Sequence, residues 1–268
     1  MPATASTPTP SRMLTEQRDS ALILTLSDPA TRNSLSPQAS ATAIEVLARA
    51  EADAQVRCIV LRGDGEHFCG GGNLQRLLGV REAGPEAQMQ SMAQLHGFVR
   101  ALQASSKPVI AAVEGFAAGA GCALVLACDL VVAATDARFV LSYGRIGLSP
   151  DAGSTWQLAR RVPRALALQM LWLPEPVTAA QWQAWGLVNQ LVDPGAALAG
   201  ALALATRLAA MAPNAVASAK ALMNDAVTSA LPEQLDRERD HFVRNLFHAN
   251  GGEGLSAFLA KRPPKFCA

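Results

Sequence analysis

The sequence has almost no net charge and no long hydrophobic run. Its 23 Lys and Arg residues nearly balance its 22 Asp and Glu residues, which leaves a formal net charge of +1. Because nucleic-acid-binding domains carry a basic patch or stripe, this balance predicts no nucleic-acid partner. No uncharged apolar run reaches the ~18 residues that a membrane-spanning helix needs, so we expect no membrane partner either.

Targeting signals are also missing. Residues 1–12 are rich in Pro, Thr and Ser and lack the apolar core of a signal peptide. We expect these residues to form a disordered lead and the protein to be cytoplasmic.

Cysteine is scarce and follows no pattern. The five cysteines are Cys58, Cys69, Cys122, Cys128 and Cys267, and none of them forms a Cys-x-x-Cys pair. An odd number without such a pair favours a reducing compartment and argues against a zinc site. We therefore expect buried or incidental thiols and no bound metal.

Several motifs of nucleotide and hydrolase chemistry are absent. The chain has no Gly-x-x-x-x-Gly-Lys-Ser/Thr, no Gly-x-Gly-x-x-Gly, no His-Glu-x-x-His and no Gly-x-Ser-x-Gly. The sequence therefore carries no signature of a P-loop enzyme, a dinucleotide fold, a zinc protease or an α/β-hydrolase.

One glycine-bearing stretch carries the clearest structural signal. Val109–Val113 is a short β-branched apolar run, which is typical of a buried strand. Gly115, Gly119 and Gly121 permit a tight turn and a close backbone approach. The small and apolar residues Ala120–Cys128 then predict a buried helix. Because unpaired N–H groups and the helix dipole meet at a helix start, this stretch is suited to a phosphate, a carboxylate or a developing oxyanion.

A second glycine segment follows another predicted strand, Val56–Leu61. It contains three adjacent glycines, Gly70–Gly72, and indicates a second place of close backbone approach. His67 on this segment is a candidate base, although a lone loop histidine is more often a solvated or hydrogen-bonded residue. Two N–H donors from separate segments, converging on one carbonyl oxygen, would stabilise an enolate or a tetrahedral intermediate.

The order of the remaining elements predicts an α/β fold. A strand at Ala21–Ser27, a helix capped by Ser36 and Pro37, and the strand at Val56–Leu61 indicate a right-handed crossover and a parallel sheet. Leu78 to Pro85 is expected to be a mobile connection. From residue 196 onward the pattern is helical and apolar, so we expect a helical region that packs on another subunit.

Asp151 lies on a loop rich in Gly and Pro that runs from Tyr143 to Gly153. A solvated or helix-capping aspartate is the simpler interpretation. A chemical role is the alternative, because a loop carboxylate could act beside the two glycine segments.

These features resemble the crotonase superfamily, the enoyl-CoA hydratase/isomerase group, from about Leu22 to Phe266. The segments that carry the resemblance are Arg32–Leu35, Phe68–Leu74, Lys107–Gly121, Ile146–Gly153 and Phe258–Phe266. The resemblance implies a ββα spiral core that binds acyl-CoA, residues 13–195, and a C-terminal α-helical oligomerisation region, residues 196–268. It also implies a homotrimer or a hexamer made of two trimers. Coenzyme A is then part of the thioester substrate, with no permanently bound cofactor.

The resemblance also assigns site residues. It implies an oxyanion hole made by the backbone N–H groups of Gly72 and Ala120. The residues expected to contact coenzyme A are Arg32, Gly70, Gly72, Asn73, Leu74 and, from a neighbouring subunit, Lys261 and Lys265.

The sequence departs from the family pattern at the hydratase glutamates. Family hydratases use two glutamates that share one water, and these positions are Ala123 and Tyr143 here, while Asn73 replaces a usual aspartate. Neither alanine nor a tyrosine of ordinary pKa replaces a carboxylate at neutral pH. Asp151 falls where isomerases, dehalogenases and ring-handling members place a catalytic aspartate. Tyr143 then either lines the pocket, which we favour, or hydrogen-bonds the substrate.

Short patterns at residues 71–77, 142–148 and 150–156 further resemble the group labelled oxepin-CoA hydrolase, alternative type. We therefore expect double-bond isomerisation or ring-handling and hydrolytic chemistry through Asp151 rather than two-glutamate hydration. The alternative is a non-catalytic acyl-CoA-binding scaffold of the same fold, which would need no Asp151.

Overall fold

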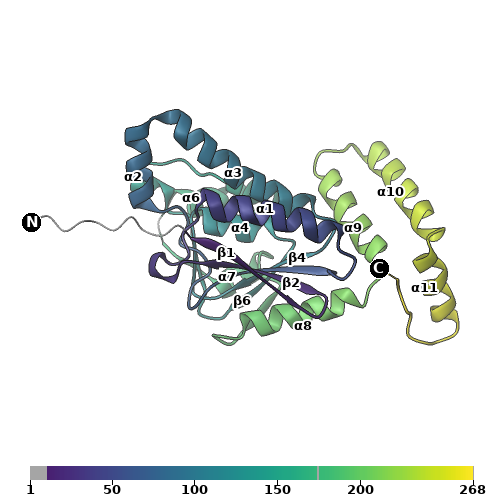
Figure 1. Cartoon of the computed structure of the whole chain (residues 1–268). Helices are drawn as coiled ribbons and strands as arrows, with labels where there is room; N and C mark the ends of the chain where they lie inside the picture. The colour runs from purple at the N-terminus through teal and green to yellow at the C-terminus, as the bar shows by residue number, and fades with distance from the viewer. Residues whose placement is uncertain (1–10, 174, 268) are drawn as a thin grey trace, which may run out of the picture.

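The computed structural model describes residues 11–173 and 175–267, and it is built around a six-stranded sheet (Figure 1). The strand order is β1-β2-β3-β4-β6-β9. β1 is antiparallel to β2, and every other neighbouring pair is parallel. The strands are β1 (Arg12–Arg18), β2 (Ala21–Ser27), β3 (Cys58–Gly63), β4 (Val109–Val113), β6 (Leu130–Ala134) and β9 (Gln190–Val192).

Both faces of this sheet are covered, which explains the unbroken apolar run of β4. Side chains alternate between the faces of a strand. Val109, Ala111 and Val113 accordingly belong to one core cluster, and Ile110 and Ala112 belong to the other. A strand buried on both sides needs apolar residues at every position.

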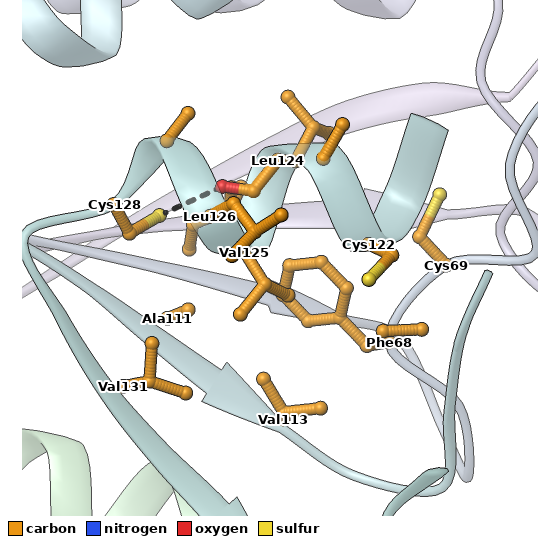
Figure 2. Packing of buried hydrophobic residues seen from close by; sticks show 14 of the residues in the cluster. Phe68, Cys69, Ala111, Val113, Cys122, Leu124, Val125, Leu126, Cys128 and Val131 are labelled. Atoms are coloured by element: carbon orange, nitrogen blue, oxygen red, sulfur yellow. Dashed lines mark hydrogen bonds between the residues drawn. The ribbon is translucent and has the colours of Figure 1, made fainter. Parts of the chain in front are cut away.

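Three helices cover the first face: α1 (Pro37–Ala52), α3 (Pro85–Ala104) and α4 (Ala120–Ala127). As predicted, Ser36 caps α1, since its hydroxyl accepts a hydrogen bond from the N–H of Ala39. All eight residues of α4 are buried. Figure 2 shows this helix above the strands, with Phe68 and Val125 in the space between them.

The second face is covered by α8 (Ala197–Ala209). Ala197, Ala201 and Ala205 recur at a spacing of four residues and lie in the second core cluster. These small side chains let the helix pack closely on the sheet. The first helix of the predicted oligomerisation region, residues 196–268, therefore packs on the core sheet.

A three-stranded sheet in the order β5-β7-β8 sits beside the main one. Its strands are β5 (Phe116–Ala118), β7 (Arg138–Val140) and β8 (Val177–Thr178). The remaining core elements are η1 (Pro29–Thr31), α2 (Leu74–Ala83), η2 (Tyr143–Ile146), α5 (Ser154–Arg161), α6 (Arg164–Trp172) and α7 (Ala179–Ala184).

Three C-terminal helices, α9 (Pro213–Ala226), α10 (Leu231–Leu246) and α11 (Ala249–Leu259), extend away from the sheet. In Figure 1 they lie at the opposite end of the molecule from α2. Several of their large apolar side chains are exposed. In α10, α11 and the two residues between them, the most accessible aromatic and leucine side chains are Leu231, Phe247, Phe258 and Leu259.

Two local expectations are wrong. The disordered segment predicted for residues 1–12 extends too far, because Ser11 is buried and β1 begins at Arg12. Residues 1–10 of that segment lie outside the described residues. The segment from Leu78 to Pro85 is not a loop, since α2 continues to Ala83 and α3 begins at Pro85. In the described part of the chain, no helix is long and apolar enough to cross a membrane.

Candidate active site

The two glycine segments identified from the sequence touch each other. The N–H of Ala118 donates to the carbonyl oxygen of Cys69 at 2.8 Å, so the segment after β3 runs beside β5. Gly71, with φ +88°, lies against the turn between β5 and α4. A Cβ atom placed on Gly71 would be 2.7 Å from the carbonyl oxygen of Ala118 and 3.4 Å from the backbone nitrogen of Ala120. Only glycine permits so close an approach.

Two backbone N–H groups remain unpaired where the segments meet. Ala120 is the first residue of α4, and Gly72 directly follows Gly71. Among the described residues, neither N–H group has a hydrogen-bond acceptor, whereas the neighbouring N–H of Gly119 donates to Val140 at 2.8 Å. Donors of this kind at a helix start can hold a negatively charged oxygen.

The loop before α5 brings Tyr143 and Asp151 together. The Tyr143 hydroxyl donates to Oδ1 of Asp151 at 2.5 Å. Ser154 anchors the loop from below, because its N–H and its hydroxyl both donate to the Asp151 backbone oxygen, at 3.0 and 2.9 Å. Ala152, with φ +49°, and Gly153 turn the chain sharply between Asp151 and α5.

This pair lies on the same side of the molecule as the unpaired N–H groups. A Cβ atom on Gly119 would be 3.9 Å from both Cζ and the hydroxyl oxygen of Tyr143. Gly119 directly precedes Ala120, so the Tyr143 ring packs against the turn that starts α4. The structure thus gathers Gly72, Ala120, Tyr143 and Asp151.

Burial sets the protonation of the pair. It raises the pKa of the Asp151 carboxyl, and the Tyr143 hydrogen bond and the charge of His96 partly oppose this shift. Burial also raises the pKa of Tyr143, and the Asp151 charge raises it further. Tyr143 is therefore protonated at neutral pH and is the donor of the bond.

Ala123 lies inside the protein and supplies no acid or base. It is fully buried in α4, and its N–H donates to the Gly119 oxygen. Asp151 therefore has no second carboxylate at the family's first glutamate position. Within residues 11–173 and 175–267, no group of three or more His, Cys, Asp or Glu side chains could hold a metal ion.

An apolar groove of about 550 Å³ runs beside this centre. Leu77 lines the groove, and its side chain would lie 3.6 Å from a Cβ atom placed on Gly72. Leu148 also lines it, and its N–H donates to the backbone carbonyl oxygen of Tyr143. The lining residues are Leu74, Leu77, Leu78, Val80, Arg81, Gly84, Pro85, Gln88, Ile146 and Leu148. The groove is suited to an acyl group because most of its side chains are apolar.

Sequence reasoning missed most of this groove. It treated the segment from Leu78 as a mobile connection, yet Asn73 caps α2 and Leu74, Leu77 and Leu78 follow at helical spacing. That cap and spacing are the signal that would have found the groove.

The expected coenzyme A residues fall into two groups. Arg32, Gly70, Asn73 and Leu74 lie around Gly72: the Gly70 N–H donates to the carbonyl oxygen of Arg32 at 2.7 Å, and the Arg32 side chain is exposed. The side-chain oxygen of Asn73 accepts a hydrogen bond from the N–H of Arg76 at 3.0 Å. His67 is structural, since its Nδ1 accepts from the Phe116 N–H.

Lys261 and Lys265 form the second group and do not join the first. They follow α11, at the end of the molecule opposite α2 (Figure 1). Within one chain the structure does not bring them to the groove.

The fold, with its mixed α/β core and C-terminal helices, is that of the crotonase superfamily. The sequence matches the family described as Enoyl-CoA hydratase/isomerase over residues 16–268. The chain therefore belongs to the enoyl-CoA hydratase/isomerase family and is an enzyme of this family.

Individual relatives are similar along nearly their whole length. The 1,2-epoxyphenylacetyl-CoA isomerase of Escherichia coli K12 is 39% identical over 246 residues, which cover 91% of this chain and 94% of the relative. The 2,3-dehydroadipyl-CoA hydratase of the same strain is 36% identical over 258 residues, covering 96% and 98%. A crystal structure of an enoyl-CoA hydratase from Polaromonas sp. JS666 is 51% identical with a TM-score of 0.94, covering 95% of this chain and 99% of that one.

Proposed function

We propose that the protein transfers a proton between two carbons of an acyl-CoA thioester whose enolate oxygen is held by the N–H groups of Gly72 and Ala120. Asp151 is the acid and base. The reaction is double-bond isomerisation or related ring-handling or hydrolytic chemistry, rather than hydration by two glutamates.

The isomerisation of a 3-enoyl-CoA needs one carboxylate only. The Asp151 carboxylate takes a proton from C2, and the electron pair of that C–H bond moves onto the thioester oxygen. The resulting dienolate returns to the thioester when C4 takes the proton back from Asp151, which leaves a conjugated 2-enoyl-CoA. No proton is gained or lost overall, so a second acid or base is not required.

The observation that carries this proposal is the lone carboxylate beside the two donors. Asp151 is hydrogen-bonded to Tyr143, and Ala123 stands where a hydratase glutamate would be. A water molecule activated between two carboxylates therefore lacks its second partner. Because its pKa is raised, Asp151 is a stronger base than an ordinary aspartate, which suits a group that both accepts and returns a proton.

The relatives' names support a CoA thioester as the substrate, and they include both an isomerase and hydratases. One similar protein is named for isomerising 1,2-epoxyphenylacetyl-CoA, a ring-bearing CoA ester, and another is named a hydratase of 2,3-dehydroadipyl-CoA. We carry the CoA thioester over to this chain as its substrate, and we assign the acyl part to the apolar groove.

Coenzyme A binding is proposed for the rim around Gly72. Arg32 carries a positive charge there, and Gly70, Gly72, Asn73 and Leu74 offer backbone groups beside the groove. Lys261 and Lys265 would add charge from a neighbouring subunit.

We also propose a homotrimer, alone or paired into a hexamer. The support is the exposed apolar surface of α10 and α11, where Phe258 is 83% exposed. Surfaces of this kind usually lie at contacts between proteins. The four buried free cysteines fit the reducing cytoplasm that we propose as its location.

A substrate comparison tests the proposed reaction. Purified protein is mixed separately with crotonyl-CoA and with 3-enoyl-CoA, and the conjugated thioester absorbance is followed. We expect the absorbance to rise with 3-enoyl-CoA and to remain nearly constant with crotonyl-CoA. Fast loss of the crotonyl-CoA signal without isomerisation would contradict the proposal, and inactivity on these and on ring-bearing CoA esters would favour a scaffold.

A further inference from the structure

Tyr143 is the only tyrosine in the sequence, and it lies in direct contact with the proposed catalytic carboxylate. Its side chain is only 7% exposed and packs against Gly119. Its backbone is held on both sides, because its N–H donates to Leu141 and its carbonyl oxygen accepts from Leu148. The ring is thus fixed in position before any substrate arrives.

The hydrogen bond occupies one oxygen of Asp151 and leaves the other available. Oδ1 accepts from Tyr143 at 2.5 Å, whereas Oδ2 has no hydrogen-bond partner among the described residues. Oδ2 is also not among the fully buried side-chain atoms that lack a partner, so it keeps accessible surface. The two oxygens of this carboxylate therefore differ before catalysis begins.

Few other titratable groups face the pair. His96 on α3 acts on Asp151 through its charge, and Cys122 on α4 acts on Tyr143. Neither has a hydrogen bond to the pair. Tyr143 is therefore the one side chain that makes a hydrogen bond to the Asp151 carboxylate in the described part of the chain.

We propose that Tyr143 is a positioning residue that acts through Asp151: its hydroxyl fixes Oδ1 so that Oδ2 is the oxygen that exchanges the proton with the acyl group. This inference rests on the proposed function, because it assigns the proton transfer to Asp151. It changes the expected role of Tyr143, which is then more than a lining side chain.

A spectroscopic test uses the single tyrosine and needs no turnover. Full-length protein is made with tyrosine isotope-labelled at Cζ, which gives one resonance, and this resonance is followed by NMR as the pH is lowered. We expect it to shift in a single step as Asp151 is protonated, and the step to vanish in Asp151→Asn. A resonance that does not move, or a step that persists in Asp151→Asn and so reports a group other than Asp151, would overturn the inference.

A kinetic test uses Tyr143→Phe with 3-enoyl-CoA. Loss of the donor disfavours the ionised carboxylate. We expect the acidic limb of the kcat profile to move up by about one pH unit, and kcat to fall about tenfold with KM changed less than about twofold. Thermal melting checks that the variant is folded.

Ser154→Ala is the matched control, because it removes a buried hydroxyl that contacts the Asp151 backbone oxygen and not its carboxylate. We expect it to leave the midpoint of the pH profile in place. An unchanged profile in folded Tyr143→Phe would refute the positioning role alone. Full activity in Asp151→Asn would instead refute the proposed function, so the two failures are distinguishable.

Discussion

Replacing Gly71 by alanine tests the contact that brings the two N–H donors together. Gly71 has φ +88°, and its added Cβ would lie 2.7 Å from the Ala118 oxygen. An L-residue in left-handed backbone costs about 1–2 kcal/mol, and forcing an atom into a packed region costs about 1–3 kcal/mol more. We expect a loss of about 2–5 kcal/mol in the free energy of unfolding.

The same substitution moves the turn that carries the Ala120 N–H. Losing one donor of this kind lowers kcat by about 100- to 1,000-fold. Denaturant unfolding measures the stability, and the rate of 3-enoyl-CoA isomerisation measures the catalytic effect.

Gly65→Ala is the control. Gly65 also has a positive φ, +69°, but a Cβ atom there would meet nothing within 4 Å. The Gly65→Ala variant should lose only about 1–2 kcal/mol of stability, which is what an L-residue in left-handed backbone costs, and it should keep its activity. If Gly71→Ala were as stable and as active as Gly65→Ala, our reasoning about the contact between the glycine segments would be refuted.

Three further predictions concern other parts of the molecule. Because burial and the Asp151 charge raise the pKa of Tyr143, tyrosinate absorbance should appear on alkaline titration only when the protein unfolds; its appearance in folded protein would contradict the buried pair. Lys220→Met should cost about 1–3 kcal/mol of unfolding free energy, since it leaves the Asp129 carboxylate, whose side chain is 28% exposed, without its partner at 2.7 Å. Burial raises the pKa of Asp129 in the folded protein. The free energy of unfolding of this variant should therefore fall as the pH rises from the ordinary aspartate pKa through the raised one, which urea unfolding at several pH values measures. Phe258→Asp should shift the assembly to smaller species by mass measurement, and an unchanged mass would exclude this residue from the interface.

The sequence was most informative where a local pattern has one physical solution. Ser36 followed by proline predicted the start of α1, and the apolar run Val109–Val113 predicted β4 with the bounds that it has. The helix after Gly119 begins where the small residues begin, at Ala120.

The missed elements have weaker local signals. β1 is an edge strand with one buried residue, Met13, so its polar sequence resembles a loop. α2 is short and contains Gly79, which lowers helix propensity. Tertiary contacts with α3 hold it in place.

The contact between Tyr143 and Asp151 could not be derived from the sequence. The seven residues between them include a backbone turn at Gly147, and Ala152, directly after Asp151, also has a positive φ. No periodicity relates the two side chains. Sequence reasoning named both residues from family position, yet it favoured a lining role for Tyr143. Only the folded loop reveals the hydrogen bond between them.

The most direct measurement of the central claim is the isomerisation rate of Asp151→Asn on 3-enoyl-CoA. Asparagine keeps the size of the side chain and an oxygen that can accept from Tyr143, but it cannot take a proton from C2. We predict a loss of about 100- to 10,000-fold in kcat, with acyl-CoA binding retained. A variant that isomerises 3-enoyl-CoA at the wild-type rate would show that another group transfers the proton, and the proposed mechanism would be wrong.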